Sequence, residues 1–285
     1  MIYITVYIKN MKAGIIGLGY WGDIIYRNLK NYDIEITTCD PFNQDADVKL
    51  HTDLHFCDKV FISTPCETHN ELCRYFLELG KDVFCEKPFG ASFLQAKDLY
   101  NLASKNHCNI FVDWIFSYSN QVNKLKTIIN NLEYGRLKSV TMNRQNLGPV
   151  RNDISAKYDL ASHDVSILLY LLNCMPNKVN WIGYKRNPQS IVNDSCFGLL
   201  QFENLIAQIN TSWHYGKKDR LCIFEFEKDF LVWDDYNQIF QCGSVNLFES
   251  GPSSLENSIN AFLQNESNMD LTLQTLKVLE YENSI

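Results

Sequence analysis

Short apolar runs alternate with helix-like segments through the first 115 residues of the chain. Apolar positions recur every three or four residues over 68–79 and 94–103, which is the spacing of amphipathic helices. Between such segments stand brief runs rich in branched or aromatic residues, which are typical of buried strands: 13–17, 34–39, 59–64, 81–85 and 109–114. Strands that alternate with helices predict a parallel sheet covered on both faces.

The pattern changes near residue 115, where we expect a domain boundary. Two helix-like segments, 120–132 and 160–172, flank a strand over 137–144. Strand-like runs then follow with short turns and little helix between them: 180–184, 196–202, 205–213, 221–227 and 230–235. Consecutive strands joined by short connections pair antiparallel, and the amphipathic segments 255–263 and 271–279 close the chain. The second region is therefore predicted to combine an antiparallel sheet with helices.

Composition narrows the class of protein. The 285 residues are 46% hydrophobic and 21% charged, which is ordinary globular usage rather than the signature of disorder. The formal net charge is -7 and the basic residues are scattered, so we expect no nucleic-acid partner. No apolar stretch reaches the roughly 18 residues that span a membrane, and the cysteines never form a C-x-x-C pair. We therefore expect a cytoplasmic protein with reduced cysteines and no membrane partner.

A G-x-G-x-x-G pattern follows the first predicted strand and opens a helix. Gly17 permits a tight turn, Gly19 lets the backbone approach a pyrophosphate, and Gly22 lets the helix pack closely on the strand. Asp40 ends the second predicted strand, where a carboxylate can accept hydrogen bonds from ribose hydroxyls. The glycines alone could form a turn without a function. The order of strand, glycine turn, helix, strand and acid favours a dinucleotide site.

The residues around Asp40 favour NAD over NADP. A carboxylate repels the 2′-phosphate of NADP, and an Arg that could accept this phosphate does not follow. The next residues are Pro41 and Phe42.

A Glu-Lys-Pro tripeptide directly follows the fourth predicted strand. Glu86, Lys87 and Pro88 therefore lie at the carboxyl end of a parallel strand, where open α/β sheets bind their ligands. The Lys87 ammonium could donate a hydrogen bond to a substrate hydroxyl and stabilise developing alkoxide charge. The alternative is a surface lysine beside a turn proline.

Asp159 and His163 stand four residues apart at the start of a predicted helix, so they share one face. A histidine held by a carboxylate is suited to take the proton of an alcohol, because its usual pKa lies near neutrality. The alternative is a helix-capping Asp beside a hydrogen-bonded His. We expect no metal, since neither the His163-Asp164 pair nor the His51 and His55 pair has the further ligands that a metal site needs.

Four motifs occur in an order that resembles a known family. GLGYWG, STPCETH, EKP and DLASH look like the glucose-fructose oxidoreductase, inositol dehydrogenase and MocA family of nicotinamide-dependent sugar oxidoreductases. The resemblance extends from Met11 to the final helix. It implies an α/β fold: an N-terminal Rossmann dinucleotide-binding domain over 11–115, and a C-terminal α+β domain with an open, mostly antiparallel sheet over 116–285. The closing helices could pack back on the first domain, and residues 1–10 would be an N-terminal extension.

The resemblance also implies roles for individual residues. The catalytic positions are Lys87, Asp159 and His163. The expected cofactor-binding residues are Gly17, Gly19, Tyr20, Trp21, Gly22, Asp40, Ser63, Thr64, Pro65, His69, Glu86 and Lys87. The expected substrate-binding residues are Lys87, Asn146, Arg151, Asp159 and His163. Segments 144–153 and 212–220 look most like family members associated with nucleotide-linked or surface-polysaccharide sugars.

These observations predict an NAD-dependent oxidoreductase that moves a hydride between nicotinamide and a secondary alcohol or ketone of a sugar. A nucleotide-linked sugar of surface-polysaccharide synthesis is the expected substrate. His163 would transfer the proton, Asp159 would orient it, and Lys87 would hold the reacting oxygen. Two alternatives stay open: a reductase of a non-sugar substrate, and a non-catalytic sugar or dinucleotide sensor. We expect a homodimer or homotetramer formed through the C-terminal sheet.

Overall fold

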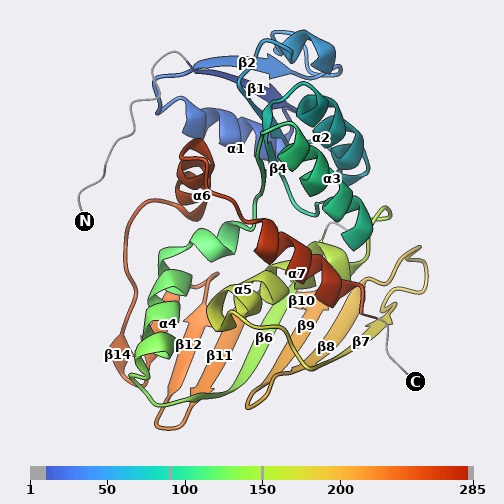
Figure 1. The fold of residues 1–285 in the computed structure, drawn as a ribbon. Coiled ribbons are helices and arrows are strands. Elements are labelled where there is room, and N and C mark those ends of the chain that lie inside the picture. Colours follow the sequence, from blue (N-terminus) through green and yellow to red (C-terminus); the bar gives the residue numbers. More distant parts are fainter. Residues whose placement is uncertain (1–10, 90–91, 149–150, 282–285) are drawn as a thin grey trace. The chain divides into compact units, whose positions relative to one another are not determined.

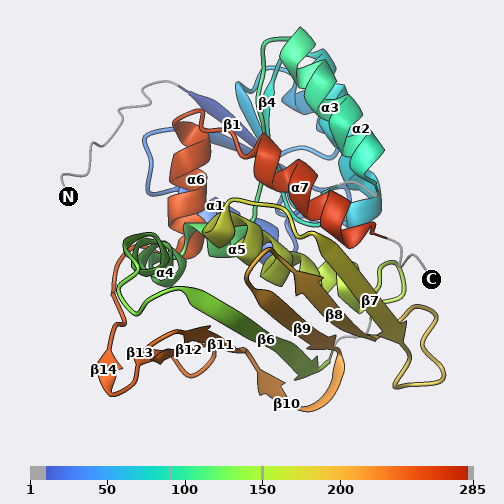
Figure 2. The same cartoon turned by 60° about the horizontal axis from the view of Figure 1, so that its bottom comes forward.

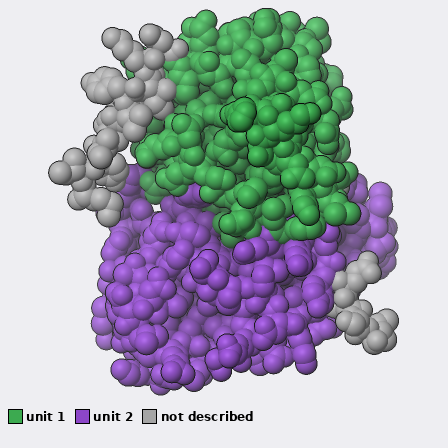
Figure 3. Space-filling model, in the orientation of Figure 1, with its two compact units in different colours: residues 1–115, 253–273 green, residues 116–252, 274–285 purple. Residues whose placement is uncertain are grey.

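The computed structural model describes residues 11–89, 92–148 and 151–281. The expected N-terminal extension, residues 1–10, lies outside the described residues. The chain divides into two compact units, which are coloured separately in Figure 3. The first unit consists of residues 1–115 and 253–273, and the second of residues 116–252 and 274–285.

The first unit contains a five-stranded parallel sheet (Figure 1). Its strands are β1 (Lys12–Ile16), β2 (Glu35–Cys39), β3 (Lys59–Ile62), β4 (Asp82–Cys85) and β5 (Ile110–Val112). The strand order is β2-β1-β3-β4-β5, and all neighbours run parallel. The chain therefore reverses its direction of travel across the sheet at β1 and β3, which is where such sheets bind ligands. All five predicted strands and their parallel pairing are confirmed.

Helices cover both faces of this sheet. The helices are α1 (Tyr20–Leu29), α2 (His69–Glu78), α3 (Phe93–Lys105) and α6 (Ser254–Leu263). Right-handed crossovers place α1 on one face and α2 with α3 on the other, as Figure 1 shows. Helix α6 comes from the far end of the chain, and its Phe262 ring packs edge-on against Phe61 of β3 at 5.3 Å between centroids.

The second unit is built on a nine-stranded sheet. Its strands are β6 (Leu137–Leu147), β7 (Lys178–Tyr184), β8 (Ser195–Gln201), β9 (Ile206–Ser212), β10 (His214–Asp219), β11 (Leu221–Phe226), β12 (Phe230–Asp234), β13 (Ile239–Cys242) and β14 (Val245–Asn246). The order is β14-β13-β12-β11-β6-β9-β8-β7, and β10 pairs with β6. Strands β6 and β9 run parallel and the other pairs antiparallel, so the prediction of an open, mostly antiparallel sheet is confirmed.

The two faces of this sheet differ. Helices α4 (Asn120–Asn131) and α5 (Ser162–Leu172) lie on one face, as Figure 2 shows. Helix α7 (Met269–Leu279) crosses from the first unit into the second. Side chains alternate along each strand, so every second residue points to the face opposite α4 and α5. That outer face exposes the apolar residues Ile182, Phe197, Leu199 and Ile206.

Candidate functional site

The glycine turn follows β1 and leads into α1. Gly17 has a φ of +88°, and a Cβ there would stand 3.0 Å from the carbonyl oxygen of Ser63. A Cβ on Gly22 would lie 1.8 Å from the Gly17 carbonyl oxygen. Gly19, the N-cap of α1, has no heavy atom within 4 Å of the place where a Cβ would stand. Gly17 and Gly22 are therefore required by the turn itself, whereas Gly19 leaves open the approach to the N-terminal amides of α1.

Asp40 follows β2 and lies against the glycine turn. Its Oδ2 accepts a hydrogen bond from the Leu18 backbone N–H at 2.9 Å. Its Oδ1 accepts from the N–H groups of Phe42 at 2.8 Å and Asn43 at 3.0 Å. Partial burial raises the pKa of Asp40, but these three hydrogen bonds and the charge of Lys49 together outweigh burial and hold the pKa below its usual value. Asp40 is therefore an ionised carboxylate that holds the backbone of the turn in place.

A pocket of about 500 Å³ opens beside this turn. It is lined by Leu18, Gly19, Tyr20, Asp23, Tyr26, Thr38, Asn43, Asp45 and Asp47. Asp40 is not among these residues but bonds to two of them, Leu18 and Asn43. Tyr20 and Trp21 are exposed aromatic residues in the first turn of α1. The open turn and this pocket fit the pyrophosphate and adenosine of a dinucleotide, and every charged residue of the lining is acidic.

The loop after β3 is tied to the glycine turn and to the loop after β4. The Ser63 hydroxyl donates a hydrogen bond to the Gly17 carbonyl at 2.8 Å. The buried His69 ring places Nε2 2.8 Å from the Thr64 carbonyl oxygen and Nδ1 3.1 Å from that of Pro88. Pro65 lies within this loop, immediately before the short 3-10 helix Cys66–Thr68. His69 thus joins two loops at the carboxyl edge of the sheet.

A buried pair of carboxyl groups lies at the ends of β4 and β5. Glu86 and Asp113 follow these neighbouring strands, and their side chains hydrogen-bond to each other. The Ser258 hydroxyl of α6 donates to Asp113 Oδ1 at 2.5 Å. Burial raises the pKa of Glu86 well above its usual value and that of Asp113 to about 7. Glu86, one member of this buried pair, directly precedes Lys87 in the chain.

Asp159 lies in a wide turn that precedes α5. The π-helical turn Lys157–Ala161 continues into α5. The helical segment therefore begins before residue 160, where the predicted helix starts, and its first turn is wider than that of an α-helix. Asp159 Oδ2 accepts a hydrogen bond from the Trp213 indole N–H at 3.1 Å. The Arg151 Nη1 lies 3.7 Å from the other carboxylate oxygen. Arg151 and the distant Trp213 thus hold Asp159, and sequence reasoning did not find Trp213.

His163 lies in the first turn of α5, above a buried ion pair. Its ring meets the Phe116 ring edge-on, with centroids 5.1 Å apart. The next residue, Asp164, forms a buried ion pair with Arg144 of β6, whose Nη2 is 2.7 Å from Oδ1. The Arg144 guanidinium in turn stacks 4.5 Å from the centre of the Phe116 ring. Asn146 stands two residues further along β6, on the same face as Arg144.

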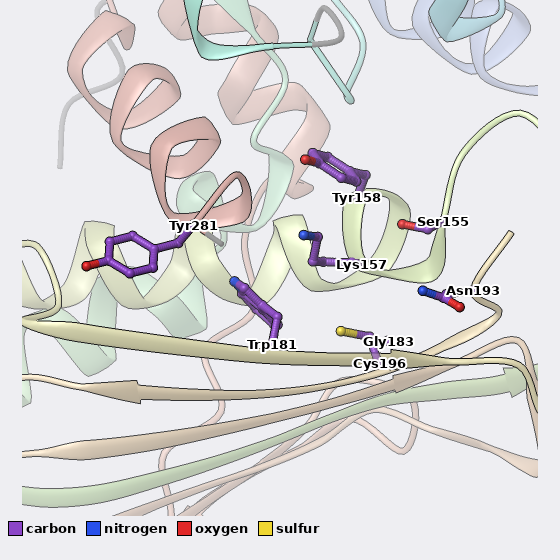
Figure 4. Close-up of a pocket in the computed structure, with 8 residues that line it drawn as sticks. All are labelled: Ser155, Lys157, Tyr158, Trp181, Gly183, Asn193, Cys196 and Tyr281. Atoms are coloured by element: carbon purple, nitrogen blue, oxygen red, sulfur yellow. The ribbon is translucent and has the colours of Figure 1, made fainter. Parts of the chain in front are cut away.

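A second pocket, of about 320 Å³, lies beside the wide turn in the second unit (Figure 4). It is lined by Ser155, Lys157, Tyr158, Trp181, Gly183, Asn193, Cys196 and Tyr281. The Lys157 ammonium stands 5.0 Å from the centre of the Tyr158 ring. Asp159 and His163 do not line this pocket, so it is distinct from the side chains expected to carry the chemistry.

The two folds together define a class of protein, the dinucleotide-binding oxidoreductases that join a Rossmann unit to a sheet-based second unit. Residues 30–114 match the model of the "Oxidoreductase family, NAD-binding Rossmann fold", and residues 122–228 match the "GFO/IDH/MocA C-terminal domain". The chain belongs to the glucose-fructose oxidoreductase, inositol dehydrogenase and MocA family. Among the described residues, no helix has both the length and the apolar character needed to cross a membrane.

Sequence relatives support this assignment. An uncharacterised oxidoreductase of Streptococcus pneumoniae is 30% identical over 133 residues, which are 42% of this chain and 36% of that protein. Inositol 2-dehydrogenase of Salmonella typhimurium is 25% identical over 235 residues, covering 72% of this chain and 69% of the enzyme.

Solved structures share the fold over nearly the whole chain. The WlbA dehydrogenase of Bordetella pertussis, in complex with NADH and UDP-GlcNAcA, has a TM-score of 0.80 at 16% identity, covering 96% of this chain and 94% of that one. UDP-N-acetylglucosamine 3-dehydrogenase of Acidithiobacillus ferrooxidans has a TM-score of 0.82 at 18% identity, covering 95% of each chain. At these identities the likeness concerns the fold alone.

Proposed function

We propose that the protein is an NAD-dependent dehydrogenase or reductase that acts on a secondary alcohol or ketone of a sugar. The observation that carries this proposal is the fixed Asp159 carboxylate one helical turn before His163, in a chain whose other unit holds the glycine turn. Family membership supports it, since relatives include an inositol 2-dehydrogenase and neighbours include dehydrogenases of UDP-linked sugars. Within the sugars, we propose a nucleotide-linked sugar of surface-polysaccharide synthesis.

The first unit would hold the dinucleotide. When bound, the nicotinamide supplies the hydride acceptor or donor. The residues proposed to contact the cofactor are Gly17, Gly19, Tyr20, Trp21, Gly22, Asp40, Ser63, Thr64, Pro65, His69, Glu86 and Lys87. The acidic side chains Asp23, Asp45 and Asp47 around the pocket would repel a 2′-phosphate, which supports NAD over NADP.

The second unit would handle the proton. His163 would take the hydroxyl proton when the alcohol is oxidised and return it when the ketone is reduced. Asp159 would position this proton transfer, because Trp213 and Arg151 hold its carboxylate on the same helical segment. Lys87 would donate a hydrogen bond to the reacting oxygen, and Asn146 would contact the sugar.

Replacement of His163 by Asn tests the proposal. The purified protein is incubated with NAD and a panel of polyols and nucleotide sugars, and NADH absorbance is followed. His163→Asn should lower turnover by about 100-fold or more while NAD affinity stays within a few-fold, because only the proton transfer is removed. His55→Asn, at an exposed position of the first unit, is the matched control. Turnover of His163→Asn within a few-fold of the parent would contradict the assignment.

We also propose that the protein is a homodimer or homotetramer formed through the outer face of the C-terminal sheet. Exposed apolar residues on neighbouring strands of that face support this, because a patch of this kind is rare on a monomer. Light scattering at micromolar concentration gives the mass directly, and a monomeric mass would contradict the proposal.

A further inference from the structure

Three charged residues stand in one row across the sheet of the second unit. Met142 of β6 pairs with Cys222 of β11, and Gln145 pairs with Asp219, so the register places Arg220 opposite Arg144. On the other side of β11, Leu221 pairs with Asp234, which places Asp235 beside Arg220.

All three side chains belong to the inner face of the sheet. In β11 the alternating residues Cys222 and Phe224 are buried beneath the helices, and Arg220 continues this alternation. Arg144 reaches Asp164 of α5 from the same face. Arg220 therefore lies beside the helix that carries His163.

Arg220 differs from its neighbour Arg144 in its partners. Arg144 is neutralised by Asp164, at 2.7 Å, and stacks on Phe116. Among the residues that the structure describes, none accepts a hydrogen bond from the Arg220 guanidinium or forms an ion pair with it. An arginine side chain offers five N–H donors in a planar fork that matches a carboxylate or a phosphate.

The surroundings of Arg220 make an unpaired charge costly. Burial lowers the pKa of Arg220 to about 10, and the neighbouring Arg144 guanidinium adds to this effect. The carboxylates of Asp164, Asp235 and Asp159 act in the opposite direction without outweighing it. A bound anion would supply the missing acceptors and offset the repulsion between the two guanidinium groups.

We propose that Arg220 recognises an anionic group of the substrate, so that the sugar taken by this protein carries a carboxylate or a phosphate. The inference rests on the proposed function, since it assigns Arg220 to the substrate side of the unit that contains His163. It makes Arg220 a specificity residue, and the proton transfer remains with His163.

Two matched pairs of sugars test the inference by binding, independently of turnover. Glucuronate and glucose differ by a carboxylate, and UDP-N-acetylglucosamine and N-acetylglucosamine differ by the nucleoside diphosphate. Calorimetry with the NADH-saturated protein gives the affinity for each. We expect at least one anionic member to bind, and Arg220→Gln to weaken that binding by about 10- to 100-fold, the usual range for a lost hydrogen bond to a charged group. Binding of the neutral members should stay within a few-fold.

Two further variants separate recognition from folding. Arg220→Lys retains the charge without the planar fork, so its affinity for the anion should be intermediate. Arg136→Gln, at an exposed arginine of the same unit, should change nothing. A glucuronate effect identifies a carboxylate substrate, and a UDP-sugar effect identifies a phosphate. The inference is overturned if Arg220→Gln and Arg220→Lys bind both anionic sugars as the parent does, or if neither anion binds the parent more tightly than its neutral counterpart. Failure to reduce NAD with any sugar would contradict the proposed function without altering this binding result.

Discussion

Replacing Asp113 by Asn removes one of the two buried carboxyl groups at the ends of β4 and β5. The substitution keeps the shape of the side chain and an oxygen that can accept the hydrogen bond of Ser258. It eliminates the titration of a group whose pKa burial raises from 3.8 to about 7. The perturbation therefore changes the pH dependence of stability more than the packing.

The sign of the effect follows from proton binding. Between the usual pKa of Asp and about 7, the folded protein keeps a proton on Asp113 that the unfolded chain has lost. The free energy of unfolding therefore falls as the pH rises through this window and is flat above it. The free energy of unfolding falls by about 1.36 kcal/mol for each pH unit between pH 5 and the pKa of about 7, and is flat from there to pH 8. The titration of Asp113 therefore lowers it by about 3 kcal/mol over this range. Asp113→Asn should remove most of that fall.

Hydrogen exchange of the β4 and β5 amides, corrected for intrinsic exchange rates, measures the stability of the first unit alone. The comparison is made between pH 5 and pH 8. Asp47→Asn is the matched control: hydrogen bonds from Thr38 lower the pKa of Asp47, so its contribution is lost only below this range. The reasoning is refuted if Asp113→Asn and the parent lose the same stability between pH 5 and pH 8.

Two further substitutions test the proposed cofactor preference and assembly. Asp40→Ala should narrow the preference for NAD over NADP by about tenfold or more in fluorescence titrations, because the carboxylate beside the glycine turn is lost; an unchanged preference, or a parent protein that already prefers NADP, would contradict the proposal. Phe197→Glu should shift the mass measured by light scattering toward the monomer, because it introduces a charge into the exposed apolar face of the sheet. An unchanged mass would exclude that face as the interface.

The strands of the first unit could be predicted because each is a short run rich in branched or aromatic residues, and all but β2 are largely buried. The second sheet was less accessible to sequence reasoning. Strand β10 (His214–Asp219) was not predicted, because its residues are polar and lack the apolar pattern of a strand. Its extended conformation comes with its pairing to β6, which the local sequence does not indicate. The parallel pairing of β6 with β9 was also not predicted. Short connections predict antiparallel pairs between consecutive strands, whereas α5, β7 and β8 lie between β6 and β9 in the chain.

The candidate site shows the same division between local and distant signals. The glycine turn is a local pattern, and the structure shows why two of its positions exclude a Cβ. The partners that hold the other groups come from far along the chain: Ser258 is 145 residues from Asp113, and Trp213 is 54 residues from Asp159. Sequence reasoning singled out neither Asp113, which lies within the run 109–114, nor Trp213, because nothing in the neighbouring residues indicates a partner so far along the chain.

The charged side chains differ between the two places where ligands are proposed to bind, and this bears on specificity. The pocket beside the glycine turn is lined by Asp23, Asp45 and Asp47, so the proposed cofactor site would disfavour an additional phosphate on the adenosine. The inner face of the second sheet presents Arg220 next to a guanidinium that is already paired, so a neutral sugar would leave the Arg220 donors without an anionic acceptor. Arg220 is partly buried, and a hydrogen bond to a charged group is stronger than one to a neutral group, so discrimination at Arg220 should be strongest against ligands that lack the anion. On these two proposals, one chain would disfavour negative charge on its cofactor and require it on its substrate, and neither preference follows from its overall charge of -7.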